Sequence, residues 1–523
     1  MADPKGFLKV ERVGPRKRDP RERIHDYHQY FAFPEEQTLR DQGGRCMSCG
    51  IPFCHEGCPL GNLIPEWNDL VHQGRWRAAL NRLHATNNFP EFTGLICPAP
   101  CESACVLDIN DDPVTIEQIE GSIAERGWAE GWIVPEPPDE RSGKTVAVVG
   151  SGPAGMAVAA ELNRFGHRVT VFERDEAVGG LMRYGVPDAK LEKWIIDRRA
   201  GLLAAEGIEF VTGVDVGTDV TTEQLRARHD AVVIAIGSRV HRDLEAPGRE
   251  LGGVHFAMDY LYQRNRCVAA GEGRPARQTP PDQVISAEGR RVVVVGGGDT
   301  GMDCISNALR EGATSARILD VYPELPAQGR PPGTPWPLPP KRTTMTYALE
   351  EGGERQFGSQ VTELVGGEDG CVITVRARQV SGTSSRDVEP VPGSDWEEPA
   401  DLVLIAIGFT GPETHGPIED LELATDRRGN VKAGVYETSE DGVFACGDAR
   451  IGQSLVVTAI AEGRKCARMV DRHLGGSGEV RRVTSETMFA IEDGDEHSLR
   501  HQAETAGAVT VGDAFWSGPR DEG

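Results

Sequence analysis

The chain has 523 residues, which predicts about three domains, and its formal net charge is −25. This acidic balance disfavours nucleic acids and anionic membrane surfaces as partners, no apolar run reaches the length of a membrane span, and the first residues lack the apolar core of a signal peptide. We therefore expect a soluble, cytoplasmic protein that binds neither nucleic acid nor membrane.

The N-terminal part is distinguished by its cysteines. Seven of the 12 cysteines lie in two blocks, CMSCGIPFCHEGC from Cys46 to Cys58 and CPAPCESAC from Cys97 to Cys105. In a reducing compartment such clustering indicates metal binding rather than disulfides. Cysteines at these spacings suit either structural zinc or iron–sulfur clusters. The sequence also predicts helices at residues 64–85 and 115–130, which indicates a small helical domain.

A first dinucleotide-binding unit is predicted for TVAVVGSGPAGMAVAAELNRFGHRVTVFE, residues 145–173. Its expected elements are strands at residues 145–149 and 169–172 and a helix at 156–164. Gly150 permits a tight turn, Gly152 lets the backbone approach a pyrophosphate, and Gly155 lets helix and strand pack closely. The helix N-terminus offers N–H groups to the phosphate, and Glu173 can accept a hydrogen bond from a ribose hydroxyl.

The same pattern occurs a second time, with Gly296, Gly298 and Gly301 in the turn and Asp320 after the second strand. Its expected elements are strands at residues 291–295 and 316–319 and a helix at 303–309. Two units suggest two dinucleotides, a flavin on one and a nicotinamide on the other. A duplicated fold with one inactive copy is the alternative, disfavoured because both copies keep three glycines and an acid.

Further stretches suit a flavin. GGLMRYGVPDAKL is glycine-punctuated and partly apolar, which suits a segment that lies against a flat ring, and a strand predicted at residues 231–236 ends at Gly237. A later strand ends at Gly447 and Asp448, and a helix begins soon after Ser454. Such an acid can hold a ribityl hydroxyl while the helix N-terminus faces the electron-rich edge of the ring.

Together these elements predict an α/β fold in which a helical iron–sulfur domain precedes two Rossmann-like dinucleotide-binding domains. Iron–sulfur clusters are favoured over zinc because seven cysteines beside a flavin fold suit electron transfer. The nicotinamide domain is expected as an insertion in the FAD domain. The expected boundaries are 1–140 for the iron–sulfur domain, 141–250 and 410–480 for the FAD domain, 251–409 for the NAD(P)H domain, and 481–523 for an acidic C-terminal tail.

Several motifs carry a family resemblance: CMSCGIPFCHEGCPLGNLIPEWNDLV, TNNFPEFTG, CPAPCESAC, GSGPAG, GGLMRYGVP, GGGDTGMD and VFACGDAR. From about residue 40 to 475, the chain resembles the small (β) subunit of glutamate synthase. It is also similar to the N-terminal half of dihydropyrimidine dehydrogenase and to ferredoxin:NADP transhydrogenases. The resemblance implies an oxidoreductase that passes electrons from NADH or NADPH, through FAD and two [4Fe–4S] clusters, to a large (α) subunit. There 2-oxoglutarate and glutamine become L-glutamate.

The resemblance also implies the cofactor ligands. It assigns one cluster to Cys46, Cys49, Cys54 and Cys105, and the other to Cys58, Cys97, Cys101 and, as a non-cysteine eighth ligand, Glu120. The alternative is that Glu120 is a solvated helix residue and water or hydroxide fills that corner. The remaining expected cofactor contacts are Pro153, Ala154, Gly180, Leu181, Asp299, Thr300 and Val456. No catalytic acid or base is expected, because hydride transfer depends on positioning the nicotinamide against the flavin.

Asp320 predicts a preference for NADH, because a carboxylate there can bind a 2′-hydroxyl but repels a 2′-phosphate. NADPH-using members of the family carry an arginine pair just after this position, whereas this chain continues with Val321 and Tyr322. An arginine from the following proline-rich loop, Arg330 or Arg342, is the alternative source of positive charge.

Two other functions fit the motifs. One is an electron-input module for another acceptor, such as ferredoxin, and the other is a non-catalytic iron–sulfur flavoprotein subunit. A disulfide reductase is disfavoured because neither Rossmann unit carries a redox C-x2-C or C-x4-C motif. Glutaminase activity should lie elsewhere, because Met1 is not followed by a cysteine nucleophile.

Overall fold

The computed structural model describes residues 4–479, except 328, 331, 332, 341, 344 and 383–386. The tail predicted for residues 481–523 lies outside this part of the chain. None of the helices described is both long and apolar enough to cross a membrane.

The cysteine-rich part is helical, as predicted. Its apolar faces, for example Trp76, Leu80 and Leu83 at helical spacing on α5, meet in one buried core with the cysteines at its edge. Its elements are η1 (Gly6–Leu8), β1 (Arg16–Lys17), α1 (Pro20–Arg23), β2 (Phe31–Ala32), α2 (Glu36–Gly43), α3 (Phe53–Gly57), α4 (Ile64–His72), α5 (Trp76–His84), α6 (Pro90–Ile96), α7 (Pro100–Ser103), η2 (Val106–Ile109) and α8 (Ile116–Ala129).

The single helix expected at residues 64–85 is wrong, because the structure has two helices there, α4 and α5. Gly74 lies between them with a φ of +77°, a left-handed conformation that favours glycine and ends the first helix. The apolar spacing continues across the break, because both helices pack against the same core.

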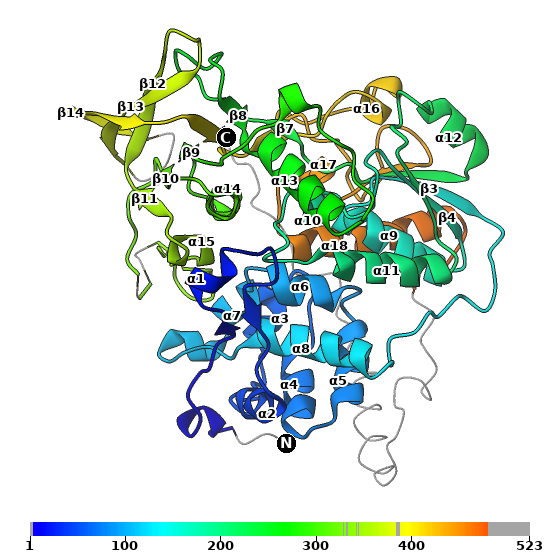
Figure 1. The fold of residues 1–523 in the computed structure, drawn as a ribbon. Helices are drawn as coiled ribbons and strands as arrows, with labels where there is room; N and C mark the ends of the chain where they lie inside the picture. Colours follow the sequence, from blue (N-terminus) through cyan, green and yellow to red (C-terminus); the bar gives the residue numbers. More distant parts are fainter. Residues whose placement is uncertain are drawn as a thin grey trace, which may run out of the picture. The chain divides into compact units, whose positions relative to one another are not determined.

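The first α/β unit is built on a parallel sheet with strand order β17–β6–β3–β4–β5. Figure 1 shows α9, α11 and α18 on the side of this sheet nearest the cysteine-rich helices. Because helices cover it, its central strands β3 and β6 are almost wholly buried and rich in β-branched residues. Its elements are β3 (Thr145–Val149), α9 (Pro153–Arg164), β4 (Arg168–Glu173), α10 (Leu181–Tyr184), α11 (Lys193–Ala205), β5 (Glu209–Thr212), α12 (Thr222–Arg228), β6 (Ala231–Ile234), α16 (Pro417–Asp420), β17 (Val443–Ala445), α17 (Asp448–Ile451) and α18 (Val456–His473).

The second α/β unit has a parallel sheet of order β11–β10–β9–β15–β8, whose strands all lie between β6 and β17 in the sequence. An antiparallel sheet of β12, β13 and β14 adjoins it, and a short ladder pairs β7 with β16. Its elements are β7 (Val240–His241), β8 (Val254–Phe256), α13 (Ala257–Gly271), η3 (Pro281–Gln283), β9 (Arg291–Val295), α14 (Asp299–Glu311), β10 (Ser315–Leu319), α15 (Tyr347–Glu350), β11 (Glu354–Gln356), β12 (Ser359–Gly366), β13 (Val372–Ser381), β14 (Glu389–Pro399), β15 (Leu402–Ile405) and β16 (Phe409–Gly411).

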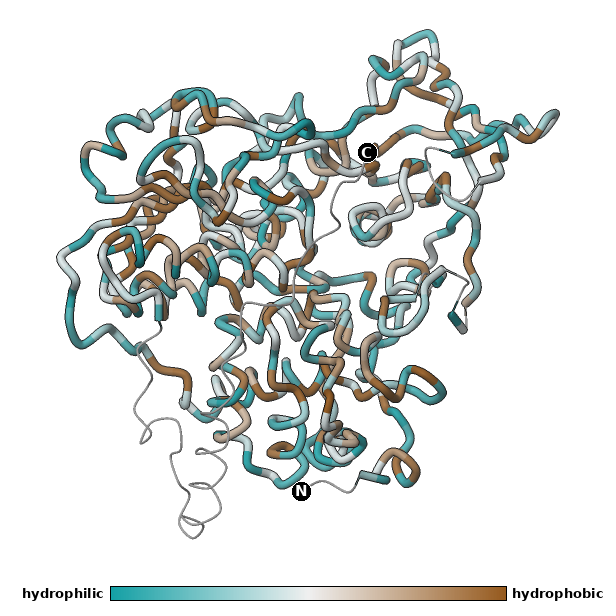
Figure 2. The backbone as a smooth tube through the Cα atoms, turned by 180° about the vertical axis from the view of Figure 1, so that it is seen from behind, coloured by the Kyte–Doolittle hydropathy of each residue, from teal (hydrophilic) through white to brown (hydrophobic). Residues whose placement is uncertain are grey.

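Hydrophobic stretches are concentrated around the sheet of the first α/β unit. In Figure 2, which shows the molecule from behind, they gather at the upper left, where that sheet lies, and hydrophilic connections surround them. The two α/β units and the helical part together confirm the predicted fold class.

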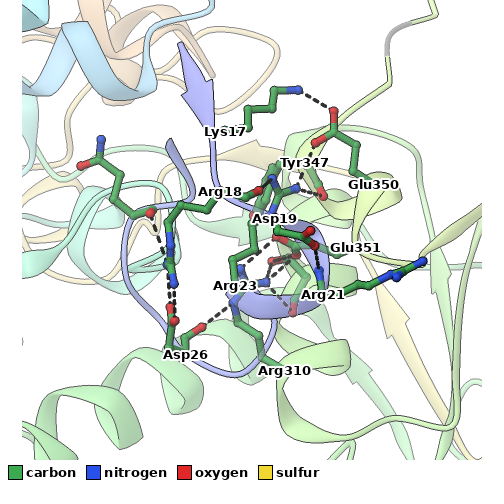
Figure 3. A network of polar contacts seen from close by, with 12 residues as sticks. Lys17, Arg18, Asp19, Arg21, Arg23, Asp26, Arg310, Tyr347, Glu350 and Glu351 are labelled. Carbon is green, nitrogen blue, oxygen red and sulfur yellow. Dashed lines mark hydrogen bonds and ion pairs between the residues drawn. The ribbon is translucent and has the colours of Figure 1, made fainter. Parts of the chain in front are cut away.

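The N-terminal segment, residues 16–32, is tied to the second α/β unit by buried charges (Figure 3). Arg23 of α1 donates from Nε to Oε1 of Glu351 at 2.6 Å, and Arg310 of α14 donates from Nη2 to the same oxygen at 3.0 Å. All three side chains are buried. Because charges are buried only when paired, this triad fixes the N-terminal segment on α14 and α15.

Candidate functional site

The glycine turn of the first unit is closely packed on one side. A Cβ at Gly155 would lie 2.0 Å from the carbonyl oxygen of Gly150, and a Cβ at Gly150 would lie 2.5 Å from that of Ala235. β6 ends at Ile234 rather than at residue 236, and the carbonyl oxygen of Ala235 lies against Gly150. By contrast, a Cβ at Gly152 would meet nothing within 4 Å. The turn is therefore tight against the sheet and open on its other side.

A cavity of about 360 Å³ lies at this turn. Residues that are far apart in the sequence line it. The expected cofactor contacts among them are Gly150, Gly152, Pro153, Ala154, Glu173, Gly180, Leu181, Gly237, Asp299, Thr300, Asp448, Ser454 and Val456. Ile96 and Pro98, on either side of Cys97, also line it. The cavity thus adjoins the second glycine turn, through Asp299, and the cysteine-rich part.

Other expected contact residues do not line the cavity themselves. Gly155 packs against the turn, and a Cβ at Gly447 would lie 2.7 Å from the Cβ of Ala154. Gly296, Gly298 and Gly301 of the second turn, and Asp320 at the carboxyl end of β10, do not line the cavity.

Two carboxyl groups line the cavity and are held by hydrogen bonds. Glu173 accepts hydrogen bonds from the backbone N–H of Ser151 at 3.1 Å and of Asp175 at 2.9 Å, and burial raises its pKa. Asp448 accepts from the hydroxyl of Ser454 at 2.6 Å, and burial raises its pKa to about 6. Both acids are oriented by neighbours and have room to accept hydroxyl donors from a ligand.

The second glycine turn repeats the packing of the first. A Cβ at Gly301 would lie 2.2 Å from the carbonyl oxygen of Gly296, and a Cβ at Gly296 would lie 2.4 Å from that of Ala406. β15 ends at Ile405, and the carbonyl oxygen of the next residue, Ala406, lies against Gly296. At the carboxyl end of β10, Asp320 forms an ion pair with Arg355 of β11. Arg355 was not among the expected site residues.

The first expected cysteine set is brought together. Cys46, Cys49, Cys54 and Cys105 line one small cavity of about 20 Å³, and apolar residues such as Ile64 form the rest of its wall. Burial raises the pKa of Cys46 to about 11 and also raises the pKa of the other three thiols. Without a cation, these thiols are therefore protonated at neutral pH.

The second expected set is also assembled. Cys58, Cys97 and Cys101 are buried within electrostatic reach of one another and of Glu120. Oε1 of Glu120 accepts hydrogen bonds from Asn87 and from Thr93, both at 2.7 Å. Burial raises the pKa of Glu120 to about 7 and that of Cys58 to about 11. Glu120 is thus a buried, oriented carboxyl beside the cysteines and not a solvated helix residue.

Within the described residues, no three Cys, His, Asp or Glu side chains converge as ligands of a single metal ion. A four-iron cluster makes a different demand, because each of its irons takes one protein ligand, usually a thiolate. One group of four thiols, and a second group of three thiols with the Glu120 carboxyl, each supply four candidate donors.

Sequence reasoning missed a buried ion pair between the two α/β units. Nζ of Lys190, just before α11, lies 3.0 Å from Oδ1 of Asp303 on α14, and both residues line the cavity. Tyr347 donates its hydroxyl to the same oxygen at 2.9 Å. Both charged residues lie inside motifs that had been singled out, GGLMRYGVPDAKL and GGGDTGMD, but their pairing depends on tertiary structure.

Comparisons with known proteins agree with this geometry. Residues 144–463 match the family described as pyridine nucleotide-disulphide oxidoreductase, and residues 23–132 match dihydropyrimidine dehydrogenase domain II, 4Fe-4S cluster. The fold and site therefore define a flavin- and pyridine-nucleotide-dependent oxidoreductase with an iron–sulfur domain.

Comparison with individual proteins identifies the family within this class of oxidoreductases. Over 91% of its length the chain is 52% identical to the small chain of NADPH glutamate synthase from Mycobacterium tuberculosis, of which it covers 97%. It is 45% identical to the corresponding small chain from Bacillus subtilis, with 91% of this chain and 99% of that one covered. It is 43% identical, over 90% of its length, to 23% of the NADH glutamate synthase of Schizosaccharomyces pombe. The chain belongs to the glutamate synthase small-chain family.

These findings confirm the predicted family, the oxidoreductase class, and the cofactors FAD, NAD(P)H and a [4Fe–4S] cluster. The number of clusters and the individual ligands stay predictions.

Proposed function

We propose that this chain is the electron-input subunit of a cytoplasmic glutamate synthase. It oxidises NADPH or NADH and passes the electrons to a large subunit, which forms L-glutamate from 2-oxoglutarate and glutamine. The observation that carries this proposal is the cavity at the first glycine turn, because its wall includes Asp299 of the second turn and both neighbours of Cys97. One cavity thus joins a nucleotide turn on one side to a thiol cluster on the other.

FAD is proposed to occupy this cavity. Gly152 leaves the wall open at the helix N-terminus, where a pyrophosphate would meet backbone N–H groups. Glu173 and Asp448 would accept hydrogen bonds from the ribose and ribityl hydroxyls. The corresponding domain boundaries are those expected from the sequence, with the FAD domain in two segments around the NAD(P)H domain.

Two [4Fe–4S] clusters are proposed for the two cysteine groups. Cys46, Cys49, Cys54 and Cys105 would hold one, and Cys58, Cys97, Cys101 and Glu120 the other. Because burial keeps the thiols protonated, binding of iron would release protons. Asn87 and Thr93 donate hydrogen bonds that orient the Glu120 carboxyl, as residues next to a metal ligand commonly do.

When bound, flavin accepts the two electrons of a hydride and releases them one at a time, which is the form that iron–sulfur clusters carry. The chain's own contribution is placement. Lys190 and Asp303 connect the two α/β units beside the cavity, and Ile96 and Pro98, the chain neighbours of Cys97, form part of its wall. No side chain is needed as a proton donor, because hydride transfer is governed by distance and orientation.

The test is an anaerobic assay of the purified full chain with and without the large subunit. We expect NAD(P)H oxidation coupled to ferricyanide for the chain alone, and glutamate formation only when the large subunit is added. Glutamate formation by the isolated chain would contradict the division of labour. Ferredoxin reduction without binding of the large subunit would identify a different acceptor, and absence of dye reduction would identify a non-catalytic subunit.

A further inference from the structure

Asp320, the acid of the second α/β unit, which is the proposed nicotinamide unit, already has an ion-pair partner in the protein. Arg355 lies on β11 opposite Ile318 of β10, and its Nε donates to Oδ2 of Asp320 at 3.2 Å. Its Nη2 donates to the same oxygen, and the backbone N–H of Tyr322 donates to Oδ1 at 3.0 Å. Asp320 is 1% exposed. The negative charge on which the NADH expectation was based is therefore largely neutralised inside the protein.

The pair lies against the glycine turn itself. A Cβ at Gly297 would lie 2.1 Å from Oδ2 of Asp320 and 2.7 Å from Nη2 of Arg355. In a Rossmann unit this place, between the glycine turn and the end of the second strand, faces the 2′ position of the adenosine ribose. The guanidinium of Arg355 would thus lie near the 2′ group of a nicotinamide dinucleotide bound at this turn.

The flavin unit shows the other arrangement. Its corresponding acid, Glu173, accepts hydrogen bonds from the hydroxyl and N–H of Ser151 and from the N–H of Asp175. No ion pair to Glu173 occurs among the residues that the structure describes. A carboxylate held by neutral donors suits a ribose hydroxyl, whereas one paired with arginine does not exclude a phosphate.

The arginines of the proline-rich loop are engaged elsewhere. Arg330 forms an ion pair with Asp108 and donates to the carbonyl oxygen of Ser103 at 2.8 Å, in the cysteine-rich part. Nε of Arg342 donates to the carbonyl oxygen of Gly329 at 2.7 Å. Arg355 is therefore the better-placed cation at the Asp320 end of the second turn.

We propose that Arg355 recognises the 2′-phosphate of NADPH and that the chain consequently binds NADPH more tightly than NADH. A guanidinium has five N–H donors and offers more than the two that face Asp320, so it can bind the phosphate without leaving its partner. Phe357, whose ring centroid lies 4.5 Å from the Arg355 guanidinium carbon, helps to hold the side chain in place. This reverses the expectation drawn from Asp320 alone, and it rests on the proposed NAD(P)H-oxidising function.

The experiment is a calorimetric titration of the FAD-loaded full chain with adenosine 2′,5′-bisphosphate and, separately, with adenosine 5′-monophosphate. These probes differ by the 2′-phosphate and contain no nicotinamide, so they report this subsite directly. We expect the bisphosphate to bind about tenfold to a hundredfold more tightly, as charge-assisted hydrogen bonds to a phosphate provide. Arg355→Gln should abolish this difference, leaving the monophosphate affinity nearly unchanged.

Arg355→Gln also leaves the Asp320 charge buried without its partner, so we pair it with the double variant Asp320→Asn/Arg355→Gln, which removes both charges. Both should lose the preference for the bisphosphate. The matched control is Arg317→Gln, which removes the same charge from β10, where Arg317 pairs with Glu354 and Glu398. It should keep the preference. An equal or weaker affinity of the wild type for the bisphosphate, or a preference that survives in the double variant, would overturn the proposal.

Reduction of the bound FAD by NADPH or NADH, followed by absorbance, distinguishes the role of Arg355 from the proposed NAD(P)H-oxidising function on which it rests. Reduction by both nucleotides with no dependence on Arg355 would overturn the role of Arg355 and leave the proposed function intact. Failure of both nucleotides to reduce the flavin would overturn both.

Discussion

The indole nitrogen of Trp336 donates a hydrogen bond to the backbone carbonyl oxygen of Cys105, at a distance of 3.1 Å. The Trp336 ring also packs on Phe53, with 4.5 Å between the ring centroids. Trp336 belongs to the proline-rich loop between β10 and α15 of the second α/β unit, whereas Cys105 and Phe53 belong to the cysteine-rich part. A loop of the second α/β unit therefore lies against the first cysteine group, at Cys105 and Phe53.

Trp336→Ala should expose this group and speed the loss of its cluster. The substitution removes both the ring that packs on Phe53 and the hydrogen bond to Cys105, so water and oxygen gain access. We expect several-fold faster release of iron to a chelator in air, with FAD content unchanged. Trp194→Ala is the control, because Trp194 lies on α11 and contacts Arg198 rather than a cysteine. Equal rates of iron release in wild type and Trp336→Ala would show that the loop does not protect the cluster.

Glu120→Ala should alter one cluster and leave the other unchanged. The carboxyl is buried beside Cys58, Cys97 and Cys101, so its removal takes away the proposed eighth ligand. We expect lower iron and sulfide content and a changed EPR spectrum for one cluster, with FAD bound. Glu125→Ala, on the same helix but paired with Arg198, should have no such effect. Unchanged iron content and EPR spectrum in Glu120→Ala would remove Glu120 from the ligand set.

Some of the fold could be predicted to the residue. The strands Thr145–Val149 and Arg291–Val295 match the expected bounds, because a buried parallel strand is a short β-branched run and the glycine turn marks its end. The break between α4 and α5 was missed because the apolar spacing continues through Gly74. That glycine was the available signal.

The site was predictable where local motifs define it and not where distant residues meet. The expected cavity residues lie in glycine and cysteine motifs whose spacing carries the chemistry. Arg355 pairs with Asp320 across 35 positions, and Trp336 meets Cys105 across 231 positions. Neither contact has a local pattern, because the alignment of β10 with β11 and the path of the proline-rich loop decide them.

The pKa of Asp448 predicts a pH dependence of stability in FAD-free protein. Burial raises this pKa from 3.8 to about 6, so between these values the folded chain binds a proton that the unfolded chain has released. The stabilisation is complete below about pH 4 and is lost as the pH rises through about 6, with a size of up to about 3 kcal/mol.

Asp448→Asn should remove this component from the pH profile of the free energy of unfolding, measured by urea denaturation. Ser454→Ala should extend the decline to higher pH, because the Ser454 hydroxyl lowers the pKa of Asp448. Identical profiles for wild type and Asp448→Asn would contradict the assigned pKa.

Glu351→Gln should loosen the N-terminal segment. Glu351 is buried and accepts hydrogen bonds from Arg23, Arg310 and Ser306. A neutral amide therefore removes the counter-charge of Arg310 and leaves Arg23 with Glu350 as its remaining carboxylate partner. We expect a loss of about 3–5 kcal/mol in the free energy of unfolding and faster proteolysis within residues 16–32. Glu354→Gln, which breaks an exposed pair with Arg317, should cost less than about 1 kcal/mol. Equal stability of the two variants would show that the buried triad does not hold the segment.

We infer that this chain carries electrons from a nicotinamide nucleotide through flavin to two iron–sulfur clusters. The most direct measurement combines iron, sulfide and FAD analysis of anaerobically purified protein with EPR spectra recorded after reduction by NADPH. Two [4Fe–4S] clusters predict about eight irons and eight sulfides per FAD, and signals of reduced cluster that appear on adding NADPH. Zinc without sulfide, or clusters that NADPH leaves oxidised while the flavin is reduced, would contradict this path of electron transfer.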